Sequence, residues 1–189
     1  ATWGRIGGGV AALRDIGALH IDAGGALYVG TFGAGVYRST DGGTGFVAAN
    51  VGLASASIFA LLEDAGGALW AGTVAEGVFV STDGGESWEN RSSGLADLEV
   101  HDLLAVGADS LYAATAGGVC LSTDAGVSWS VRSQGLGNLK TVSLARRPGG
   151  PYLYAGTTTT TTEESGVYRS SDGGESWTLV ATGLTNTRI

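Results

Sequence analysis

The stretch STDGGESWEN at residues 81–90 decides the fold, because close copies of it return along the chain. Related stretches begin at Ser39, Ser122 and Ser170. Each copy places an aspartate in a Gly-rich turn, and an aromatic residue follows five positions later. The four aspartates are Asp41, Asp83, Asp124 and Asp172, at intervals of 42, 41 and 48 residues. A catalytic carboxylate is needed once or twice in a chain, so a fourfold copy indicates a repeated structural unit.

Each repeat contains four short segments of alternating character separated by Gly-rich turns. In the second unit these segments are SIFALLED, ALWAGT, GVFVSTD and SWENRSS. Connections this short join antiparallel neighbours, and a unit of about 40 residues with four strands is typical of one propeller blade. The sequence therefore predicts an all-β fold, a β-propeller of four-stranded antiparallel blades. The predicted blades are residues 13–53, 54–96, 97–137 and 138–184.

The repeated box is expected at the turn between the third and fourth strands. Its Ser and Asp side chains can accept hydrogen bonds from nearby backbone N–H groups, and its Gly pair tolerates positive φ. The aromatic residue that follows is expected to bury its ring against its own blade. We interpret the boxes as structural and not catalytic. Their residues are Ser39, Asp41, Gly43, Ser81, Asp83, Gly85, Trp88, Ser122, Asp124, Gly126, Trp129, Ser170, Asp172, Gly174 and Trp177.

The pattern Ser-x-Asp-x-Gly-x-Ser/Thr-Trp resembles the Asp-box, or bacterial neuraminidase repeat. That repeat occurs in sialidases, xyloglucan-cleaving hydrolases, sortilin-type receptors and the photosystem II assembly-factor family. The match is specific in 81–88 and 170–177. It is weaker in the first copy, where Gly45-Phe46 replaces Ser-Trp, and in the third, where Ala125 replaces Gly. The resemblance implies a β-propeller, but these families share a fold and not a function.

The two ends of the chain are out of phase with the four units. Residues 1–12, which include Trp3, match the outer strand and exit of a preceding blade. Residues 185–189 match the approach to a further blade. The simplest interpretation is part of a larger propeller. We expect the remaining blades of the same propeller, or another chain, as partners of the open edges, which otherwise favour aggregation.

The resemblance to two kinds of glycoside hydrolase implies catalytic residues, and the sequence can be searched for them. Sialidase-like activity would need three Arg, a Tyr/Glu pair and an Asp acid, and the Arg-Ile-Pro phrase is absent, with GRIGG at 4–8 the nearest match. Xyloglucanase-like activity would need an Asp pair, and no Asp stands in the loops after the second strands. We therefore expect a non-catalytic platform. The alternatives are a glycoside hydrolase whose catalytic blades lie outside these residues, and a structural repeat of a surface assembly.

Composition excludes several classes of partner. The 189 residues include 18 acidic and 10 basic side chains, a net charge of −8, which disfavours nucleic acid and anionic membrane surfaces. No apolar run approaches the roughly 18 residues of a membrane span, so no membrane insertion is predicted. Cys120 is the single cysteine, which rules out an internal disulfide. His20 and His101 lack metal-ligand spacing, and neither a metal nor a cofactor is predicted.

A binding site is expected at one end of the blades, where the second-to-third loops and the links between blades meet. The fourth such loop is the longest, with eight residues between Thr157 and Gly166. The competing interpretation is that these are solvated loop residues. By analogy with the sortilin-type and assembly-factor families, we expect a protein or glycan partner outside the cytoplasm. The candidate binding residues are Asp15, Phe32, Glu76, Glu99, His101, Lys140, Glu163 and Glu164.

Overall fold

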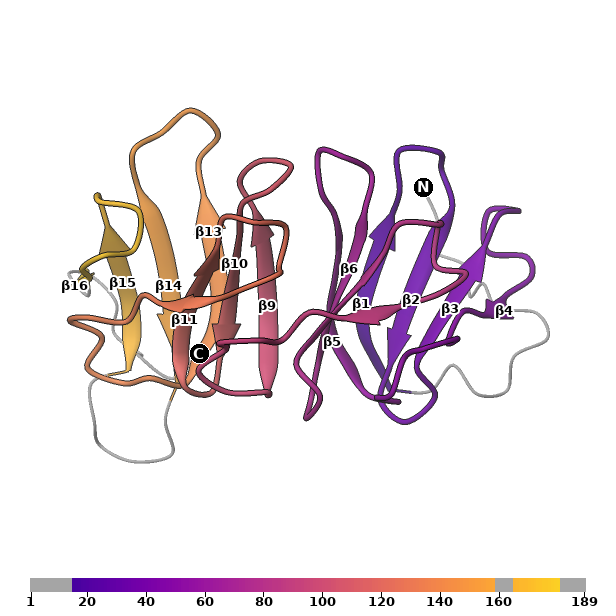
Figure 1. The fold of residues 1–189 in the computed structure, drawn as a ribbon, viewed down its shortest axis with the longest axis horizontal. Helices are drawn as coiled ribbons and strands as arrows, with labels where there is room; N and C mark the ends of the chain where they lie inside the picture. The colour runs from indigo at the N-terminus through magenta and orange to yellow at the C-terminus, as the bar shows by residue number, and fades with distance from the viewer. Residues whose placement is uncertain (1–14, 159–164, 181–189) are drawn as a thin grey trace, which may run out of the picture.

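The computed structural model describes residues 15–158 and 165–180, and these form sixteen strands (Figure 1). The strands make four separate four-stranded sheets, each antiparallel and each with its strands in chain order. No helix occurs among the described residues. The all-β prediction with four-stranded antiparallel units is confirmed. The predicted outer strand in 1–12, the approach at 185–189, and Glu163 and Glu164 lie outside the described residues.

We name the four sheets blade 1 to blade 4. Blade 1 consists of β1 (Ile16–Ile21), β2 (Leu27–Thr31), β3 (Val36–Ser39) and β4 (Val47–Ala48). Blade 2 consists of β5 (Ile58–Glu63), β6 (Leu69–Thr73), β7 (Val78–Ser81) and β8 (Glu89–Asn90). Blade 3 consists of β9 (Val100–Ala105), β10 (Leu111–Thr115), β11 (Gly118–Ser122) and β12 (Ser130–Val131). Blade 4 consists of β13 (Thr141–Arg146), β14 (Leu153–Thr157), β15 (Gly166–Ser170) and β16 (Thr178–Leu179).

A threonine closes the end of the second strand in every blade. The buried hydroxyl of Thr73 donates a hydrogen bond of 2.8 Å to the Gly77 carbonyl, which ties β6 to the start of β7. Thr31 and Thr115 make the same bond. Thr157 does so over 3.4 Å to Gly166 across the longer loop of blade 4. The repeated Thr is therefore a loop fastener, and the insertion in blade 4 leaves it in place.

The hydrophobic core lies between the blades, because each sheet packs on its neighbour through side chains from both. Trp70, Val78 and Val80 of blade 2 meet Val100 and Leu111 of blade 3 in one cluster. Similar clusters join blade 1 to blade 2 and blade 3 to blade 4. A middle blade thus buries both faces, and all five residues of β6 are buried. The simple alternation of buried and exposed residues in a one-sided sheet is absent for this reason.

The box forms a self-contained turn between the third and fourth strands. In blade 2 the Ser81 hydroxyl donates to Asp83 Oδ1 at 2.7 Å and accepts from the Gly85 N–H at 2.8 Å. Asp83 Oδ1 also accepts from the Ser87 N–H at 2.9 Å. Gly84 and Gly85 have φ of 72° and 85°, the left-handed region that glycine enters at little cost. The other three boxes repeat the Ser hydroxyl bonds and the bond from the residue four after the aspartate.

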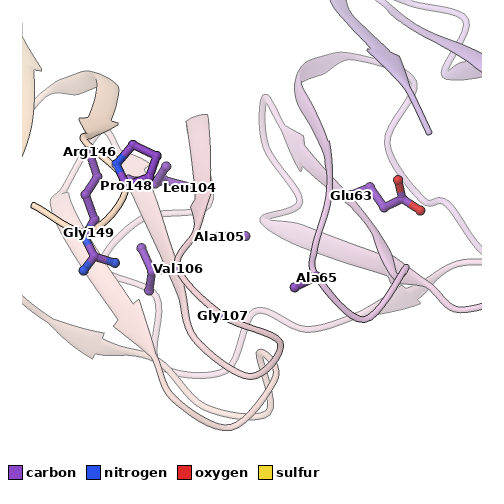
Figure 2. A pocket seen from close by; sticks show the side chains of 9 residues that line it. All are labelled: Glu63, Ala65, Leu104, Ala105, Val106, Gly107, Arg146, Pro148 and Gly149. Atoms are coloured by element: carbon purple, nitrogen blue, oxygen red, sulfur yellow. The ribbon is translucent and has the colours of Figure 1, made fainter. Parts of the chain in front are cut away.

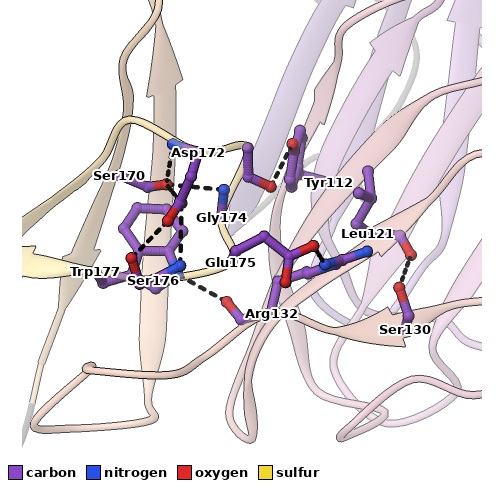
Figure 3. A network of polar contacts seen from close by, with 11 residues as sticks. Tyr112, Leu121, Ser130, Arg132, Ser170, Asp172, Gly174, Glu175, Ser176 and Trp177 are labelled. Atoms are coloured by element: carbon purple, nitrogen blue, oxygen red, sulfur yellow. Dashed lines mark hydrogen bonds and ion pairs between the residues drawn. The ribbon is translucent and has the colours of Figure 1, made fainter.

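The tryptophans of the second, third and fourth boxes contact the preceding blade and not only their own, which corrects the prediction. Trp88 Nε1 donates to the Ala49 carbonyl of blade 1 at 2.8 Å, and Trp129 Nε1 donates to the Arg91 carbonyl of blade 2 at 2.7 Å. Trp177 Nε1 likewise donates to Arg132 of blade 3 (Figure 3). Because a propeller sheet is packed on both faces, a ring on the outer strand is best buried in the gap between two blades.

An aromatic residue on the preceding blade completes this junction. The Tyr28 hydroxyl donates to the Gly84 carbonyl at 2.9 Å, and the Tyr112 hydroxyl donates to the Gly173 carbonyl at 2.9 Å. Trp70 lies against Gly126, where an added Cβ would be 2.7 Å from the indole. We call the box tryptophan, the box glycines and this aromatic residue the clasp. Three clasps join the four blades, so the box fastens its own turn and also holds the blade before it.

Acid should weaken the boxes. Hydrogen bonds from Ser87, Ser128 and Ser176 lower the pKa of Asp83, Asp124 and Asp172 to about 2, from an ordinary value of 3.8. A carboxyl group whose pKa is lowered by folding stabilises the fold at pH values above its ordinary pKa. That stabilisation is lost as the pH falls toward the pKa of the folded state. We expect the urea midpoint to fall between pH about 4 and about 2.

Two variants isolate this effect. Asp83→Ala should make the acid loss shallower, because one of the titrating carboxyls is gone. Ser87→Ala removes the hydroxyl that donates to Asp83 Oδ2 at 2.5 Å, and should move part of the loss to higher pH. Acid-unfolding curves of Asp83→Ala and the native chain that superimpose would contradict the assignment.

Candidate functional site

The first strand of every blade carries a β-bulge at its second residue. In β5, Ile58 pairs with Thr73 and Ala60 pairs with Gly72, so Phe59 has no partner in the ladder. The register shifts at the same place in β1, β9 and β13. A bulge turns the side chain of its extra residue out of the regular alternation, a device often found next to binding sites. The four bulge residues are Gly17, Phe59, His101 and Val142.

Two of these bulge residues take part in a row of aromatic rings. Phe32, the residue after β2, lies edge-on to Phe59 with ring centroids 5.3 Å apart. Phe59 in turn lies 4.8 Å from the His101 ring. Gly17, the bulge residue of blade 1, leaves room for Phe32, because a Cβ there would be 3.1 Å from the phenyl ring. The row therefore runs across blades 1, 2 and 3.

A charged pair extends the row to blade 4. Glu99 Oε1 lies 3.1 Å from His101 Nε2 and 3.2 Å from Lys140 Nζ. Lys140 is the only lysine of the chain, and its side chain is 46% exposed. Phe32 is 40% exposed at the other end. We call Phe32, Phe59, His101, Glu99 and Lys140 the bulge row, which offers apolar ring edges at one end and a charge of each sign at the other.

Electrostatics keep the centre of the row neutral. Burial lowers the pKa of His101 and Lys140 lowers it further, whereas Glu99 opposes the shift. The imidazole is therefore uncharged at neutral pH. Its Nε2 is buried and faces Glu99 Oε1 at 3.1 Å.

Short turns in the segments that link the blades fix the backbone positions of the residues that precede the first strands. The Glu99 N–H donates to Asp97 Oδ1 at 2.8 Å, and the Lys140 N–H donates to Asn138 Oδ1 at 2.8 Å. In blade 2 the Ser57 N–H approaches Ser55 Oγ at 3.3 Å in the same way. A side chain that bonds the backbone two residues on holds the chain in a tight bend. The row is therefore placed by backbone turns before any partner arrives.

Six of the eight predicted binding residues lie in the described part of the chain, and the structure brings four of these together. Phe32, Glu99, His101 and Lys140 meet in the bulge row. Asp15 touches it only through its carbonyl, which accepts from the Phe32 N–H at 2.9 Å. Glu76 is held through its backbone, where its N–H donates to Thr73 and its carbonyl accepts from Asn90. Phe59 was not predicted as a candidate, because within SIFALLED it reads as one more core residue.

Asp102, beside His101, has a structural role. Its Oδ2 accepts from the Leu144 N–H of blade 4 at 2.8 Å, and its Oδ1 accepts from the Leu103 N–H at 2.9 Å. Burial raises the pKa of Asp102, and the two N–H groups partly oppose that shift. Both carboxyl oxygens are thus engaged with the backbone. Asp102 joins the first strands of blades 3 and 4.

A cavity of about 520 Å³ lies at the opposite end of the first strands (Figure 2). It is lined by the ends of β5, β9 and β13 with their turns, including Glu63, Leu104, Val106, Arg146 and Pro148. The sequence analysis expected the binding site at the other end of the blades, where the second-to-third loops and the links between blades lie. Glu63 is already engaged, because its Oε2 accepts from the Ala23 N–H at 2.8 Å. Apart from the engaged Glu63 carboxylate and Arg146, the walls of this cavity are mostly apolar, so few polar groups fix the orientation of a ligand.

The described part of the chain was compared with two further kinds of site, a metal-ligand cluster and a membrane-spanning helix. Within residues 15–158 and 165–180, no three His, Cys, Asp or Glu side chains gather as metal ligands. The same residues contain no helix with the length and hydropathy of a membrane span. Cys120 is buried, its pKa is raised by that burial, and its sulfur accepts from the Ala96 N–H.

Comparison with known proteins identifies the repeat. The family model of the BNR/Asp-box repeat matches residues 79–90. No curated protein matches the sequence. Among solved structures, an ancestral GH74 enzyme superposes with a TM-score of 0.74 at 21% identity, over 92% of this chain and 26% of that one. The GH74 xyloglucanase from Xanthomonas campestris gives 0.67 at 18% identity, over 92% of this chain and 31% of that one.

Other similar structures carry no enzyme name. The extracellular domain of a B. thetaiotaomicron protein described as a hybrid two-component system gives a TM-score of 0.71 at 15% identity, covering 88% of this chain and 24% of that one. YCF48 bound to D1 peptide gives 0.65 at 18% identity, covering 89% of this chain and 56% of that one. This chain thus spans between about a quarter and just over half of the structures it matches. The chain has a β-propeller fold, and residues 79–90 of its second blade match the BNR/Asp-box repeat.

Proposed function

We propose that the chain is a non-catalytic binding platform, and that the bulge row is the surface on which it holds a protein or glycan partner outside the cytoplasm. The similar structures support the setting, since they include an extracellular sensor domain, a peptide complex and enzymes that act on a glycan. The residues of the row support the role. An exposed phenyl ring and a partly exposed ion pair suit recognition of a partner with apolar and polar groups.

One observation carries this proposal. Structural positions repeat the same residue in all four blades, as Ser39, Ser81, Ser122 and Ser170 do in the boxes. The four bulge positions instead hold Gly, Phe, His and Val, and the residues two before them are Asp, Ser, Glu and Lys. The backbone is the same in each blade, so the fold alone does not demand these differences. A surface that varies on a constant scaffold is the arrangement expected of a recognition site.

The carboxyl groups near the row do not suit hydrolysis. A glycoside hydrolase uses two carboxyl groups, one of which must give up a proton to the leaving group. Asp97 and Asp102 accept backbone hydrogen bonds, and Glu99 is paired with Lys140. Asp102 is the one with a raised pKa, and both of its oxygens already accept N–H groups. These contacts favour the binding function over the alternative of a hydrolase.

An array experiment tests the platform. The labelled chain is applied to an array of oligosaccharides, neutral and uronic-acid types, and to an array of peptides. We expect a hit on one array, with at least about a tenfold loss of affinity, near 1.4 kcal/mol, in Phe32→Ala and in Lys140→Glu. Glu76→Gln is the matched control, because Glu76 is exposed on the equivalent loop of blade 2 and lies outside the row.

The same experiment can reject the proposal. Both substitutions are at partly exposed side chains, so a thermal unfolding scan should show that the variants stay folded. A partner that binds Phe32→Ala and Lys140→Glu as tightly as the native chain would place the site elsewhere. Release of reducing sugar from the bound glycan would overturn the non-catalytic assignment.

A further inference from the structure

The turn between the first and second strands of blade 4 departs from the repeat. Six residues separate Arg146 from its ladder partner Leu153, whereas five residues separate the corresponding partners in blades 1, 2 and 3. The turn contains Pro148 and Pro151, which are the only two prolines of the chain. Because proline fixes φ, the two prolines stiffen this longer turn.

The residue that begins this turn also differs between the blades. In blades 1 and 2 it is an aspartate, and Asp22 and Asp64 each accept an N–H group of their own turn at 2.8 Å. The corresponding residues, directly after the first strand, are Val106 in blade 3 and Arg147 in blade 4. An acidic residue with a structural role is thus replaced by an apolar residue in one blade and by a basic residue in the next.

These departures from the repeat lie around the cavity of about 520 Å³ (Figure 2). Leu104 and Val106 of blade 3 and Pro148 of blade 4 form an apolar wall, and Arg146 stands on the same side. The volume falls within the roughly 300–1,000 Å³ of small-molecule pockets in proteins. The stiffened turn therefore forms part of the wall of a cavity that is large enough for a small ligand.

Arg146 brings a positive charge to this wall with no carboxylate opposite it. Its guanidinium makes no hydrogen bond or ion pair with any residue in 15–158 or 165–180. Glu63, on the far wall, points away from Arg146 in Figure 2 and accepts from the Ala23 N–H. Burial raises the pKa of the Tyr112 hydroxyl in blade 3, and the Arg146 charge opposes that shift, so the guanidinium lies within electrostatic range of blade 3.

We propose that this cavity binds a small organic acid, with its carboxylate on the Arg146 guanidinium and its apolar body against the wall formed by Leu104, Val106 and Pro148. The planar guanidinium fits a carboxylate through two parallel hydrogen bonds. The apolar wall removes the carbon atoms of the ligand from water. A doubly charged phosphate is disfavoured, because its second charge would have no partner against apolar walls. The cavity and the bulge row lie at opposite ends of the first strands, so this site is independent of the proposed function.

Methyl NMR titrations with three small probes test the site. Naphthalene-1-carboxylate has an apolar body and a charge, 1-naphthylmethanol has the body alone, and acetate has the charge alone. We expect naphthalene-1-carboxylate to shift the methyl signals of Leu104 and Val106, with an affinity at least about tenfold higher than that of either other probe. The proposal is overturned if about 5 mM naphthalene-1-carboxylate shifts neither residue, or if 1-naphthylmethanol binds as tightly.

Two neighbouring arginines give a matched pair of variants. Arg146→Gln should weaken naphthalene-1-carboxylate binding about tenfold or more and leave 1-naphthylmethanol binding unchanged. Arg147→Gln is the control and should bind as the native chain does, because Arg147 is also exposed and carries the same charge but does not line the cavity. Arg146→Lys keeps the charge and loses the paired hydrogen bonds, so its affinity should lie between those of the native chain and Arg146→Gln.

The variants can also reject the site. Arg146 is exposed, so the methyl signals far from the cavity should stay in place and show that the variants are folded. Full affinity for naphthalene-1-carboxylate in Arg146→Gln would show that the guanidinium does not hold the carboxylate. An equal loss in Arg146→Gln and Arg147→Gln would show a general effect of charge, and either result overturns the proposal.

Discussion

Replacing Trp129 by alanine should lower the free energy of unfolding by about 3–5 kcal/mol, the range for deleting a large buried aromatic side chain. The indole is 6% exposed and lies in the core between blades 2 and 3. The change removes its packing and its hydrogen bond to the Arg91 carbonyl, and leaves a cavity between two sheets. Urea unfolding followed by far-ultraviolet circular dichroism measures the loss.

Two further variants separate packing from hydrogen bonding at this position. Trp129→Phe keeps most of the ring and loses Nε1, and we expect about 1–2 kcal/mol of the total from the unpaired Arg91 carbonyl and the smaller ring. Val127→Ala is the control on the same turn, since Val127 is 56% exposed and should change little. A cost of Trp129→Ala below about 1 kcal/mol would mean that the clasp does not hold the blades together.

Replacing Gly94 by alanine should cost about 2–5 kcal/mol, from two causes that act together. Gly94 has φ of 87°, where a side chain costs about 1–2 kcal/mol. A Cβ there would also lie 2.3 Å from the Trp129 carbonyl oxygen, and forcing atoms into a packed site adds about 1–3 kcal/mol. Gly52 and Gly135 stand in the same place beside Trp88 and Trp177.

The glycines of the chain supply matched controls for this second change. Gly25→Ala meets the positive φ of 86° with no atom within 4 Å, so it isolates the backbone strain. Gly107→Ala meets neither a positive φ nor a neighbour, and its cost should be near zero. The expected order of loss is Gly94, then Gly25, then Gly107. An equal loss at Gly94 and Gly25 would show that the contact with the Trp129 carbonyl is relieved by a shift of the chain.

The blades and box turns could be predicted because their determinants are local in the sequence. The bonds of Ser81 and Asp83 reach at most four residues along the chain, and the strands show as short segments between Gly-rich turns. The repeat itself supplied the number of units. Pairing of strands in chain order then follows from the shortness of the turns.

The contacts between blades could not be predicted in the same way. Trp129 and Arg91 are 38 residues apart, and alternation along a strand does not say which neighbour a given face meets. The bulge at Phe59 could not be predicted from the segment SIFALLED. A bulge shifts the strand register by one residue and so changes which side chains point inward, but it needs no particular residue type. All members of the bulge row except Phe59 were predicted from loop position, but only the structure shows that their side chains meet.

Each clasp joins a blade to the box of the next blade in the chain, and this fixes the order in which the blades can be completed during translation. Tyr28 bonds a residue 56 positions later, and Tyr112 bonds one 61 positions later. At about 5–20 residues per second, a ribosome completes that stretch in about 3–12 s. During this interval a finished sheet waits with its face open to solvent and to chaperones. Each blade of the nascent chain is therefore sealed by the one translated after it.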